Sequence, residues 1–318
     1  MGPRRRPRRR LRLVVAVALA LGAAAGGGAC RRSTGPSTAG GATSSSTAAP
    51  ARLAFGPPVL RGEITDERVA ESSGVVASRR NPGRLWTHDD SDTPPVLYCV
   101  EPDGGSCGGW TVDGATNVDW EDIAAGPGPQ PGEHYLYVGD IGDNVRGRAG
   151  IVVYRVVEPT VAPAGKRSVV DGTTAPATAI HLHYDDGPHD AESLAVHPTT
   201  GAIYVIVKDP SDTGVYRVRP GGDTLTRVGT LNLGLFGLAT GADISPDGRR
   251  VAVCTPVGGY ELTLGPGADF DSIWDERPSP VILPGRAQGE AIAYRLDDDA
   301  LFVTSEGYPS PLYEIPRL

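Results

Sequence analysis

A short pattern of a small residue, an aliphatic residue and another small residue, often preceded by an acid, occurs five times along this chain. The copies occupy residues 71–77, 119–125, 190–196, 238–244 and 288–294. Aligned on Val75, Ile123, Leu194, Ala242 and Ile292, they lie 48, 71, 48 and 50 residues apart. A repeat near this period, with several short strands in each unit, is typical of a β-propeller, whose blades bring equivalent positions to one central mouth. The sequence therefore predicts an all-β propeller.

Each repeat unit predicts four strands, because short runs of β-forming residues alternate with turn residues. The fifth unit supplies only three strands, and residues 58–64 offer the missing fourth. We therefore expect the N-terminal strand to complete the last blade and close the ring, which would hide two exposed sheet edges. Five blades are predicted. Six is the alternative, if the insertion around residues 158–178 contains a further sheet.

The first 52 residues predict export rather than folded structure. Residues 1–29 combine seven Arg with a short apolar run, which is the pattern of a signal peptide. The run ends in Gly-Gly-Ala-Cys30, which resembles a bacterial lipobox, although Gly27 stands where a lipobox prefers Leu. Lipidation of Cys30 would place the protein on the outer face of the cytoplasmic membrane. Ordinary cleavage after Ala25 and plain secretion, or the twin-arginine route, stay open.

We expect residues 30–52 to be the lipid-anchored Cys and a flexible Ser/Thr/Gly/Ala linker, and residues 53–318 to be the propeller domain. Removal of the signal peptide leaves 23 basic against 38 acidic residues, a formal charge of −15. This charge disfavours nucleic acid and anionic lipid as partners. A monomer is predicted that touches the membrane only through its lipid anchor.

Two of the four cysteines predict a disulfide bond. Cys99 and Cys107 flank a turn-rich loop and can face each other across paired strands. An oxidising compartment favours the bond. Cys254 lies within an apolar strand and is expected to be buried.

The acidic residues of the repeats are expected to meet at one mouth of the propeller. In each blade the first strand begins at the face where the second strand ends, so acids at these two positions share one rim. The candidate metal ligands from these positions are Glu71, Asp90, Asp119, Glu121, Asp140, Asp190, Glu192, Glu290 and Glu306. The fourth unit differs, because Thr240 and Thr255 replace the charged residues.

Crowded carboxylates stay ionised only when a cation offsets their charge. Hard divalent cations prefer oxygen ligands, and Ca²⁺ takes about 6–8 of them at about 2.3–2.6 Å. Ca²⁺ is the predicted cofactor, with Mg²⁺ or Mn²⁺ as alternatives. Zn²⁺ is disfavoured because no Cys/His cluster has its spacing. A purely structural role for these acids also stays open.

Two further residues are weaker candidates for catalysis. His88 could act as a general base, although a His that follows a strand more often holds a loop. Lys208 is the one cation expected on the acidic rim, where it could contact an anionic substrate or pair with Asp209 or Asp190. No nucleophile elbow, zinc-protease motif or phosphate loop is present in the sequence.

Several motifs resemble those of a family of secreted bacterial β-propeller proteins. The motifs are Leu85-Trp-Thr-His-Asp-Asp-Ser, Asn117-Val-Asp-Trp-Glu-Asp-Ile-Ala, Gly139-Asp-Ile-Gly-Asp-Asn and His189-Asp-Ala-Glu-Ser-Leu. The resemblance implies the fold and export, and it implies no reaction. Asp89 stands where this family more often has Asn. The layout is also loosely similar to calcium-dependent propeller phytases and nucleotidases, without any matching motif.

Three functions are compatible with these features. The first is an extracytoplasmic binding module that holds Ca²⁺ and binds a glycan, a peptide or a partner protein. The second is a metal-dependent hydrolase of phosphate esters. The third is a scaffold whose acids have only a structural role.

Overall fold

The computed structural model describes residues 54–162, 169–218, 221–234, 237–285 and 288–318. The predicted signal peptide, lipidated Cys30 and linker lie outside the described residues. The chain divides into Met1–Pro50 and Ala51–Leu318, and every described residue belongs to the second unit. Across the described ranges, no helix has the length and apolar character needed to cross a membrane.

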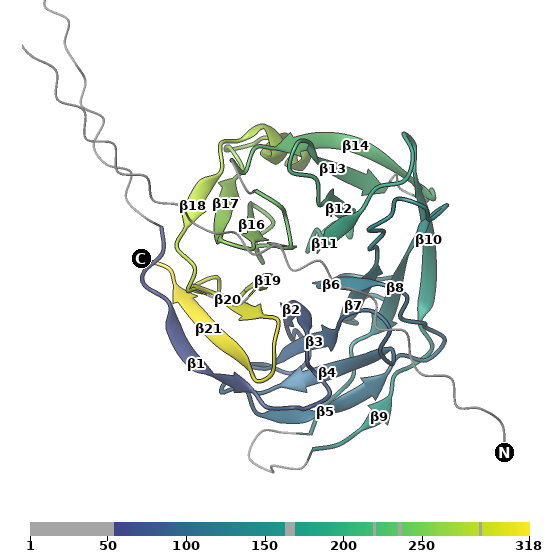
Figure 1. Ribbon diagram of the computed structural model, residues 1–318, viewed down its shortest axis with the longest axis vertical. Helices are drawn as coiled ribbons and strands as arrows, with labels where there is room; N and C mark the ends of the chain where they lie inside the picture. The colour runs from purple at the N-terminus through teal and green to yellow at the C-terminus, as the bar shows by residue number, and fades with distance from the viewer. Residues whose placement is uncertain (1–53, 163–168, 219–220, 235–236, 286–287) are drawn as a thin grey trace, which may run out of the picture. The chain divides into compact units, whose positions relative to one another are not determined.

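The described residues form an all-β structure of antiparallel four-stranded groups, one for each sequence repeat (Figure 1). The first group contains β2 (Ser72–Ala77), β3 (Leu85–Asp89), β4 (Val96–Val100) and β5 (Ser106–Thr111). The second contains β6 (Trp120–Gly126), β7 (Tyr135–Asp140), β8 (Ile151–Val157) and β10 (Thr178–Tyr184). The third contains β11 (Ala191–Val196), β12 (Ile203–Val207), β13 (Thr213–Val218) and β14 (Thr224–Leu231).

The last two groups complete the ring. The fourth contains β15 (Gly241–Ile244), β16 (Arg250–Thr255), β17 (Gly258–Thr263) and β18 (Ser279–Val281). A short 3-10 helix, η1 (Phe270–Asp275), lies between β17 and β18. The fifth contains β19 (Gly289–Tyr294), β20 (Ala300–Ser305), β21 (Ser310–Pro316) and β1 (Val59–Ile64). The first strands β2, β6, β11, β15 and β19 each lie against the next around the central axis, and β19 returns to β2. The predicted β-propeller is confirmed.

The N-terminal strand closes the ring as predicted. β1 pairs with β21 in antiparallel register, from Val59 opposite Glu314 to Ile64 opposite Ser310. The pairing of β1 with β21 hides the outer edge of β21. It joins segments that are about 250 residues apart in sequence.

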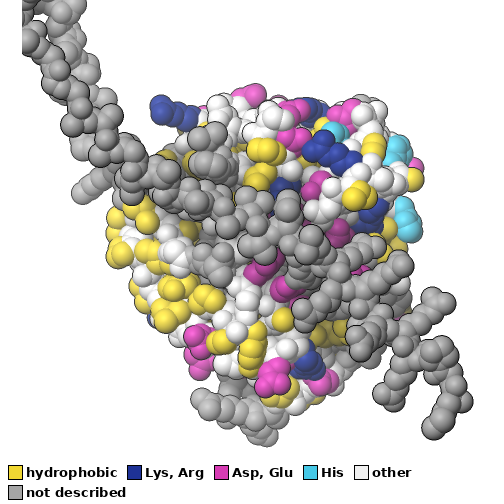
Figure 2. Space-filling view, in the orientation of Figure 1, with side chains coloured by type: hydrophobic (Ala, Val, Ile, Leu, Met, Phe, Trp, Pro, Cys, Tyr) yellow, Lys and Arg dark blue, Asp and Glu magenta, His cyan; other side chains and the backbone are white. Residues whose placement is uncertain are grey.

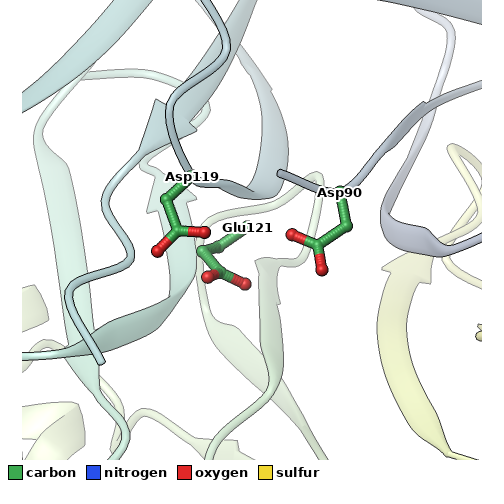
Figure 3. A group of neighbouring side chains, drawn as sticks. All are labelled: Asp90, Asp119 and Glu121. Carbon is green, nitrogen blue, oxygen red and sulfur yellow. The ribbon is translucent and has the colours of Figure 1, made fainter. Parts of the chain in front are cut away.

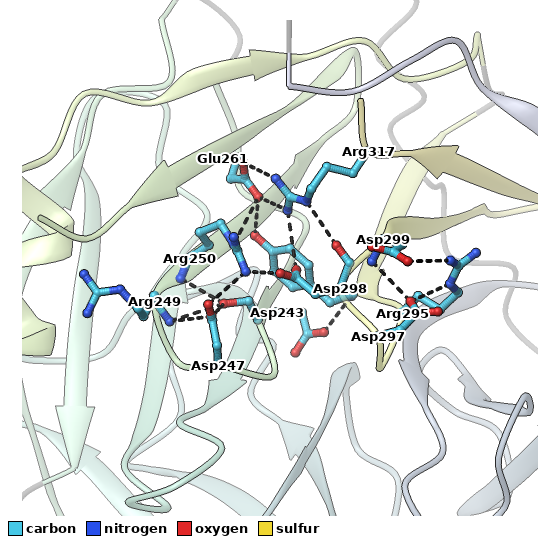
Figure 4. A network of polar contacts seen from close by, with 12 residues as sticks. Asp243, Asp247, Arg249, Arg250, Glu261, Arg295, Asp297, Asp298, Asp299 and Arg317 are labelled. Atoms are coloured by element: carbon cyan, nitrogen blue, oxygen red, sulfur yellow. Dashed lines mark hydrogen bonds and ion pairs between the residues drawn. The ribbon is translucent and has the colours of Figure 1, made fainter. Parts of the chain in front are cut away.

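A network of ion pairs ties the fourth group to the fifth at the end of the strands remote from the predicted acidic mouth (Figure 4). The Nη2 atom of Arg317 lies 2.7 Å from Oε1 of the buried Glu261, and the guanidinium also lies 4.4 Å from the ring centre of Phe55. Arg250 pairs with Asp298 of the β19–β20 turn. Because Phe55 precedes β1 and Arg317 follows β21, the network joins both ends of the described chain to the fourth group.

The hydrophobic core consists of five clusters, and each cluster fills the space between two neighbouring groups. Trp86 and Trp120 pack between the first and second groups, and Trp274 of η1 packs between the third and fourth. Burial of such large side chains is the main favourable contribution to folding. Both the small and the aliphatic residues of the repeat belong to these layers, as Ala195 and Leu194 show.

The insertion of the second unit adds no separate sheet in its described part. Its strand β9 (Gly172–Thr173) pairs in parallel with β5, opposite Trp110 and Thr111. The second and third groups share one sheet, because β10 and β14 pair in parallel at His183 and Tyr184. The count of five blades therefore stays a prediction, although every described strand except β9 belongs to one of the five groups.

The predicted disulfide between Cys99 and Cys107 is present across β4 and β5, with a Cα–Cα distance of 5.1 Å. Its loop spans only 8 residues, so the loss of chain entropy in the unfolded state that it imposes is modest. We expect the double change Cys99→Ser and Cys107→Ser to lower the free energy of unfolding by about 2 kcal/mol in urea titrations. Equal stability of the oxidised and serine forms would contradict this expectation.

Candidate cation site at the acidic mouth

The acids of the repeat occupy the same kind of irregular position in their strands. The inner strands β2, β6, β11 and β19 each skip residues in their pairing with the second strand of the group. All four strands skip the residue at the same aligned position of the repeat. This residue is Ser73 in β2, Glu121 in β6, Glu192 in β11 and Glu290 in β19. A β-bulge turns the direction of one side chain relative to the ladder. The repeated bulge therefore directs three glutamates away from the regular pairing pattern and toward the mouth.

Three carboxylates meet at one point of this mouth (Figure 3). Asp119 and Glu121 come from the start of β6, and Asp90 follows the end of β3. One oxygen of each carboxylate lies within 4.8 Å of an oxygen of both others. This spacing suits three ligands of a single hard cation, whose oxygen ligands surround it at about 2.3–2.6 Å.

The loop after β7 lies against two of the three carboxylates. A Cβ atom added to Gly142 would lie 2.2 Å from Oε1 of Glu121 and 2.4 Å from Oδ2 of Asp119, so a larger residue would force these carboxylates to move. Asp140 accepts hydrogen bonds from the amides of Val118 and Asp119 at 3.2 Å. Asp140 thus positions the segment that carries Asp119, and it lies outside the group of three carboxylates.

Arg148 connects the same elements. Its guanidinium lies 2.8 Å from Oδ1 of the buried Asp140 and donates a hydrogen bond of 2.8 Å to the carbonyl oxygen of Gly142. The positive charge therefore offsets Asp140, while Asp119 keeps a raised pKa. Arg148 and Asp140 thus form an ion pair that supports the cluster. Asp140 is one of the residues that the sequence predicted as metal ligands.

A second part of the mouth is formed by Glu192, Glu290 and Lys208. Lys208 donates a hydrogen bond to Oε1 of Glu192. The other oxygen of Glu192, Oε2, is buried and has no hydrogen-bond partner among the described residues. A buried carboxylate oxygen without a partner is costly unless a cation, a proton or a water molecule satisfies it. A proton, which the raised pKa of Glu192 favours, or a bound cation would satisfy this atom.

Burial and the charges of neighbouring acids raise the pKa values of four acids in the mouth, Asp119, Glu121, Glu192 and Glu290. Burial, followed by the charges of Asp90 and Asp190, raises the pKa of Asp119 to about 6. Burial raises the pKa of Glu192 to about 7 in spite of the opposing charge of Lys208. Burial and the charge of Glu192 raise the pKa of Glu290 to about 9.

The pKa of Glu121 is raised as well. Its pKa lies well above the usual value, because of burial first and then the charges of Glu192, Asp90 and Asp119. These raised pKa values mean that the ionised carboxylates lack sufficient compensating charge within the protein. A bound divalent cation would supply this compensating charge.

The remaining predicted ligands lie around this centre. Glu71 and Glu306 form an isolated antiparallel bridge between the segments before β2 and after β20. Glu306 also accepts a hydrogen bond of 2.9 Å from the side chain of Gln288. Asp190 accepts a hydrogen bond of 2.8 Å from the amide of Asp143, which links the segment before β11 to the loop after β7.

His88 lies beneath the mouth surface rather than on it. Its side chain is fully buried, and its ring packs edge-on against Trp120 at a centroid distance of 5.8 Å. Nδ1 lies 3.1 Å from the carbonyl oxygen of Asp89, and burial lowers the pKa of His88 to about 4. The structure therefore encloses a neutral imidazole, and the catalytic role of His88 stays a prediction.

Sequence reasoning missed Asp122, which adjoins the bulge acid Glu121. Oδ2 of Asp122 accepts hydrogen bonds from the amides of Leu194 at 2.9 Å and Ala242 at 3.1 Å, and Oδ1 accepts from Ile123 at 2.8 Å. Its carboxylate thus joins three inner strands at the axis. The acid at this position occurs once among the aligned repeats, so periodicity alone gave no reason to single it out.

Comparisons with known proteins leave the function open. No family model matches the sequence, and no curated protein matches it. The chain is similar to the PQQ-bound aldose sugar dehydrogenase from Streptomyces coelicolor, with 10% identity and a TM-score of 0.49 over 83% of this chain and 98% of that chain.

Two further solved structures show comparable similarity. The WD40 repeats of RRP9 align with 10% identity and a TM-score of 0.43 over 83% of this chain and 100% of that chain. A nidogen/laminin complex aligns with 13% identity and a TM-score of 0.42 over 74% of this chain and 73% of that chain. None of these similarities assigns an activity or a ligand to this protein.

Proposed function

We propose that this protein is an exported, lipid-anchored β-propeller that binds Ca²⁺ at its acidic mouth and serves as an extracytoplasmic binding module. The observation that carries the proposal is the group formed by Asp90, Asp119 and Glu121, whose carboxylate oxygens lie within 4.8 Å of one another. The buried Oε2 of Glu192, which has no partner within the described part of the chain, supports it independently.

The donor set favours a hard cation. All three candidate ligands are carboxylates, and neither a Cys nor a His belongs to the described cluster. Zn²⁺ and Cu²⁺ prefer nitrogen or sulfur ligands, whereas Ca²⁺, Mg²⁺ and Mn²⁺ prefer oxygen. Ca²⁺ accepts irregular geometry and a larger number of ligands, which suits three side chains from the loop after β3 and the start of β6 and leaves positions for water or a ligand.

Export is proposed from the N-terminal sequence. Residues 1–29 have the composition of a signal peptide, Cys30 ends a lipobox-like run, and a Ser/Thr-rich linker follows. The disulfide between Cys99 and Cys107 is compatible with an oxidising compartment. The linker would hold the propeller away from the membrane surface, so that its mouth is accessible to soluble ligands.

The alternative functions remain predictions. A phosphoesterase-type hydrolase would need a base or a cation free to act on a substrate, whereas His88 is buried and Lys208 is engaged by Glu192. A purely structural scaffold would need each mouth acid to be satisfied by the protein itself. The raised pKa values of Glu121 and Glu290 argue against such satisfaction.

Thermal unfolding in Ca²⁺ and in chelator tests the proposal. A cation that binds only the folded state raises its stability, and a concentration of about 100 times Kd corresponds to a rise of about 5 °C in melting temperature. We expect Glu121→Gln to abolish this rise, because it removes a charged ligand from the cluster and keeps the shape of the side chain.

The exposed Glu67 offers a matched control. Glu67→Gln makes the same change of charge on a loop outside the cluster, and we expect it to retain the full calcium response. A melting temperature that is equal in Ca²⁺ and chelator for the parent protein would refute the cation site. An equal response in the parent and in Glu121→Gln would refute the assignment of this ligand.

A further inference from the structure

Lys208 places a positive charge among the carboxylates of the mouth. The space-filling view shows basic side chains interspersed among acidic ones on one face of the ring (Figure 2). Lys208 directly follows β12, and its amide donates a hydrogen bond of 2.9 Å to the carbonyl oxygen of Asp190. Its side chain is 26% exposed, and its Nζ atom pairs with Oε1 of Glu192. Both the backbone and the ammonium group are therefore held in place.

Other groups carry a carboxylate at the same position of the repeat. The residue that directly follows the second strand is Asp90 after β3, Lys208 after β12 and Glu306 after β20. Asp90 belongs to the three carboxylates of the candidate cation site. Equivalent positions of the blades have equivalent places around the axis of a propeller. Lys208 thus puts a cation where another repeat puts a ligand for a cation.

Three glutamates act on the ammonium group. Besides its direct partner Glu192, Lys208 experiences the charges of Glu290 and Glu121. Burial alone would lower the pKa of Lys208, but the three glutamates outweigh this effect and raise the pKa above its ordinary value. The ammonium group therefore stays charged at neutral pH and provides a permanent positive charge in this half of the mouth.

The carboxylates around Lys208 can bind more than one ammonium group. Glu192 is 7% exposed, and its Oε2 atom has no hydrogen-bond partner among the residues that the structure describes. Glu290 is 4% exposed and occupies the same bulge position of its own strand. An ammonium group supplies one charge and three donors, whereas Ca²⁺ supplies two charges and takes about 6–8 oxygen ligands. Without Lys208, these buried oxygens would attract a second divalent cation.

The ammonium group opposes such a second ion while it is present. Like charges repel strongly in a partly buried site, because the effective dielectric constant there is lower than in water. Glu121 links the two halves of the mouth, because it belongs to the group of three carboxylates and its charge also acts on Lys208. A cation held by that group and the ammonium group would share the negative charge of Glu121.

We propose that Lys208 is a built-in cation that limits the mouth to one divalent cation. The group of three carboxylates binds Ca²⁺, and the ammonium group takes the second cation position beside Glu192 and Glu290. The binding of the first ion rests on the proposed function. The inference adds the residue that sets the number of ions.

Isothermal titration of the protein with CaCl₂ at pH 8 tests the inference. We expect the parent to bind one Ca²⁺ per chain and Lys208→Met to bind two, because methionine has a similar length and no charge. Lys208→Arg keeps the charge and should bind one. Arg146→Met is the matched control, since Arg146 pairs with Asp209 at 2.7 Å and its loss removes the same charge without uncovering Glu192. This variant should also bind one Ca²⁺.

A single bound ion in Lys208→Met, or a second ion in Arg146→Met, would overturn the inference. A double variant, Lys208→Met with Glu192→Gln, leaves neither member of the ion pair charged and serves if the single variant does not fold. It should bind one Ca²⁺, and loss of binding would overturn the inference by showing that Glu192 holds the first ion.

Failure of the proposed function gives a different result. A parent protein that binds no Ca²⁺ would refute the cation site of Asp90, Asp119 and Glu121. In that case, one ion bound by Lys208→Met would still support the role of Lys208, and no ion in either protein would overturn both proposals.

Discussion

Asp122→Ala is expected to lower the free energy of unfolding by about 4 kcal/mol. The carboxylate accepts three backbone hydrogen bonds, from Ile123 of its own strand, from Leu194 of β11 and from Ala242 of β15. Alanine would leave three amides at the propeller axis without acceptors, and each buried unpartnered amide costs about 1–3 kcal/mol. Urea unfolding followed by tryptophan fluorescence measures the loss.

Two variants make this prediction specific. Asp122→Asn keeps one carbonyl oxygen as an acceptor and should lose less than half as much stability. The exposed Asp113→Ala removes a carboxylate from a loop and should stay within about 0.5 kcal/mol of the parent. A loss below about 1 kcal/mol for Asp122→Ala would show that the inner strands are held together without this carboxylate.

Without divalent cations, the protein is expected to lose about 3 kcal/mol of stability between pH 7 and pH 9. The pKa of Glu290 is raised from 4.5 to about 9 by burial and by the charge of Glu192, and that of Glu192 is raised to about 7. An acid with a raised pKa binds more protons in the folded state than in the unfolded state. Its stabilising contribution is therefore present at low pH and is lost as the pH rises through the folded pKa.

The chosen pH range separates the mouth acids from His88. Burial lowers the pKa of His88 to about 4, so its linkage has the opposite sign and ends near the ordinary His value of 6.5. Above pH 7 the glutamates dominate. Denaturant unfolding in chelator across this range measures the effect.

Removal of the titrating group supplies the control. Glu290→Gln should flatten the decline by more than half, and it should make the protein more stable than the parent at pH 9. Saturating Ca²⁺ should have a similar effect, because the cation stabilises ionised carboxylates. A parent protein whose stability is constant or rises between pH 7 and pH 9 in chelator would contradict the electrostatics of the mouth.

Sequence reasoning located the strands and the closure because both depend on local patterns. Turn residues between short runs of β-forming residues predicted four strands in each unit, and the structure has four-stranded groups. The residues of β1 were recognised as the missing strand of the last repeat, because a repeat with one strand too few leaves an edge to be covered. The disulfide followed in the same way from a short turn between two strands.

The candidate site was predictable only in part. The acids before each first strand were identified by their repetition, yet their side-chain directions depend on bulges at Glu121, Glu192 and Glu290. A bulge shifts the pairing register by one residue, and a shift of one residue moves a side chain to the other face. The role of Asp140 as a cation ligand stays a prediction, and in the structure its carboxylate accepts a hydrogen bond from the amide of Asp119.

The sequence by itself determined a ring of similar all-β units, because the spacing of strand-forming and turn-forming residues is a local property that repeats. Only the tertiary structure decided which atoms meet at the axis. Asp122 bonds to amides that lie 72 and 120 residues further along the chain. Such contacts arise from closure of the ring, which joins residues whose separation in sequence carries no information about their distance in space.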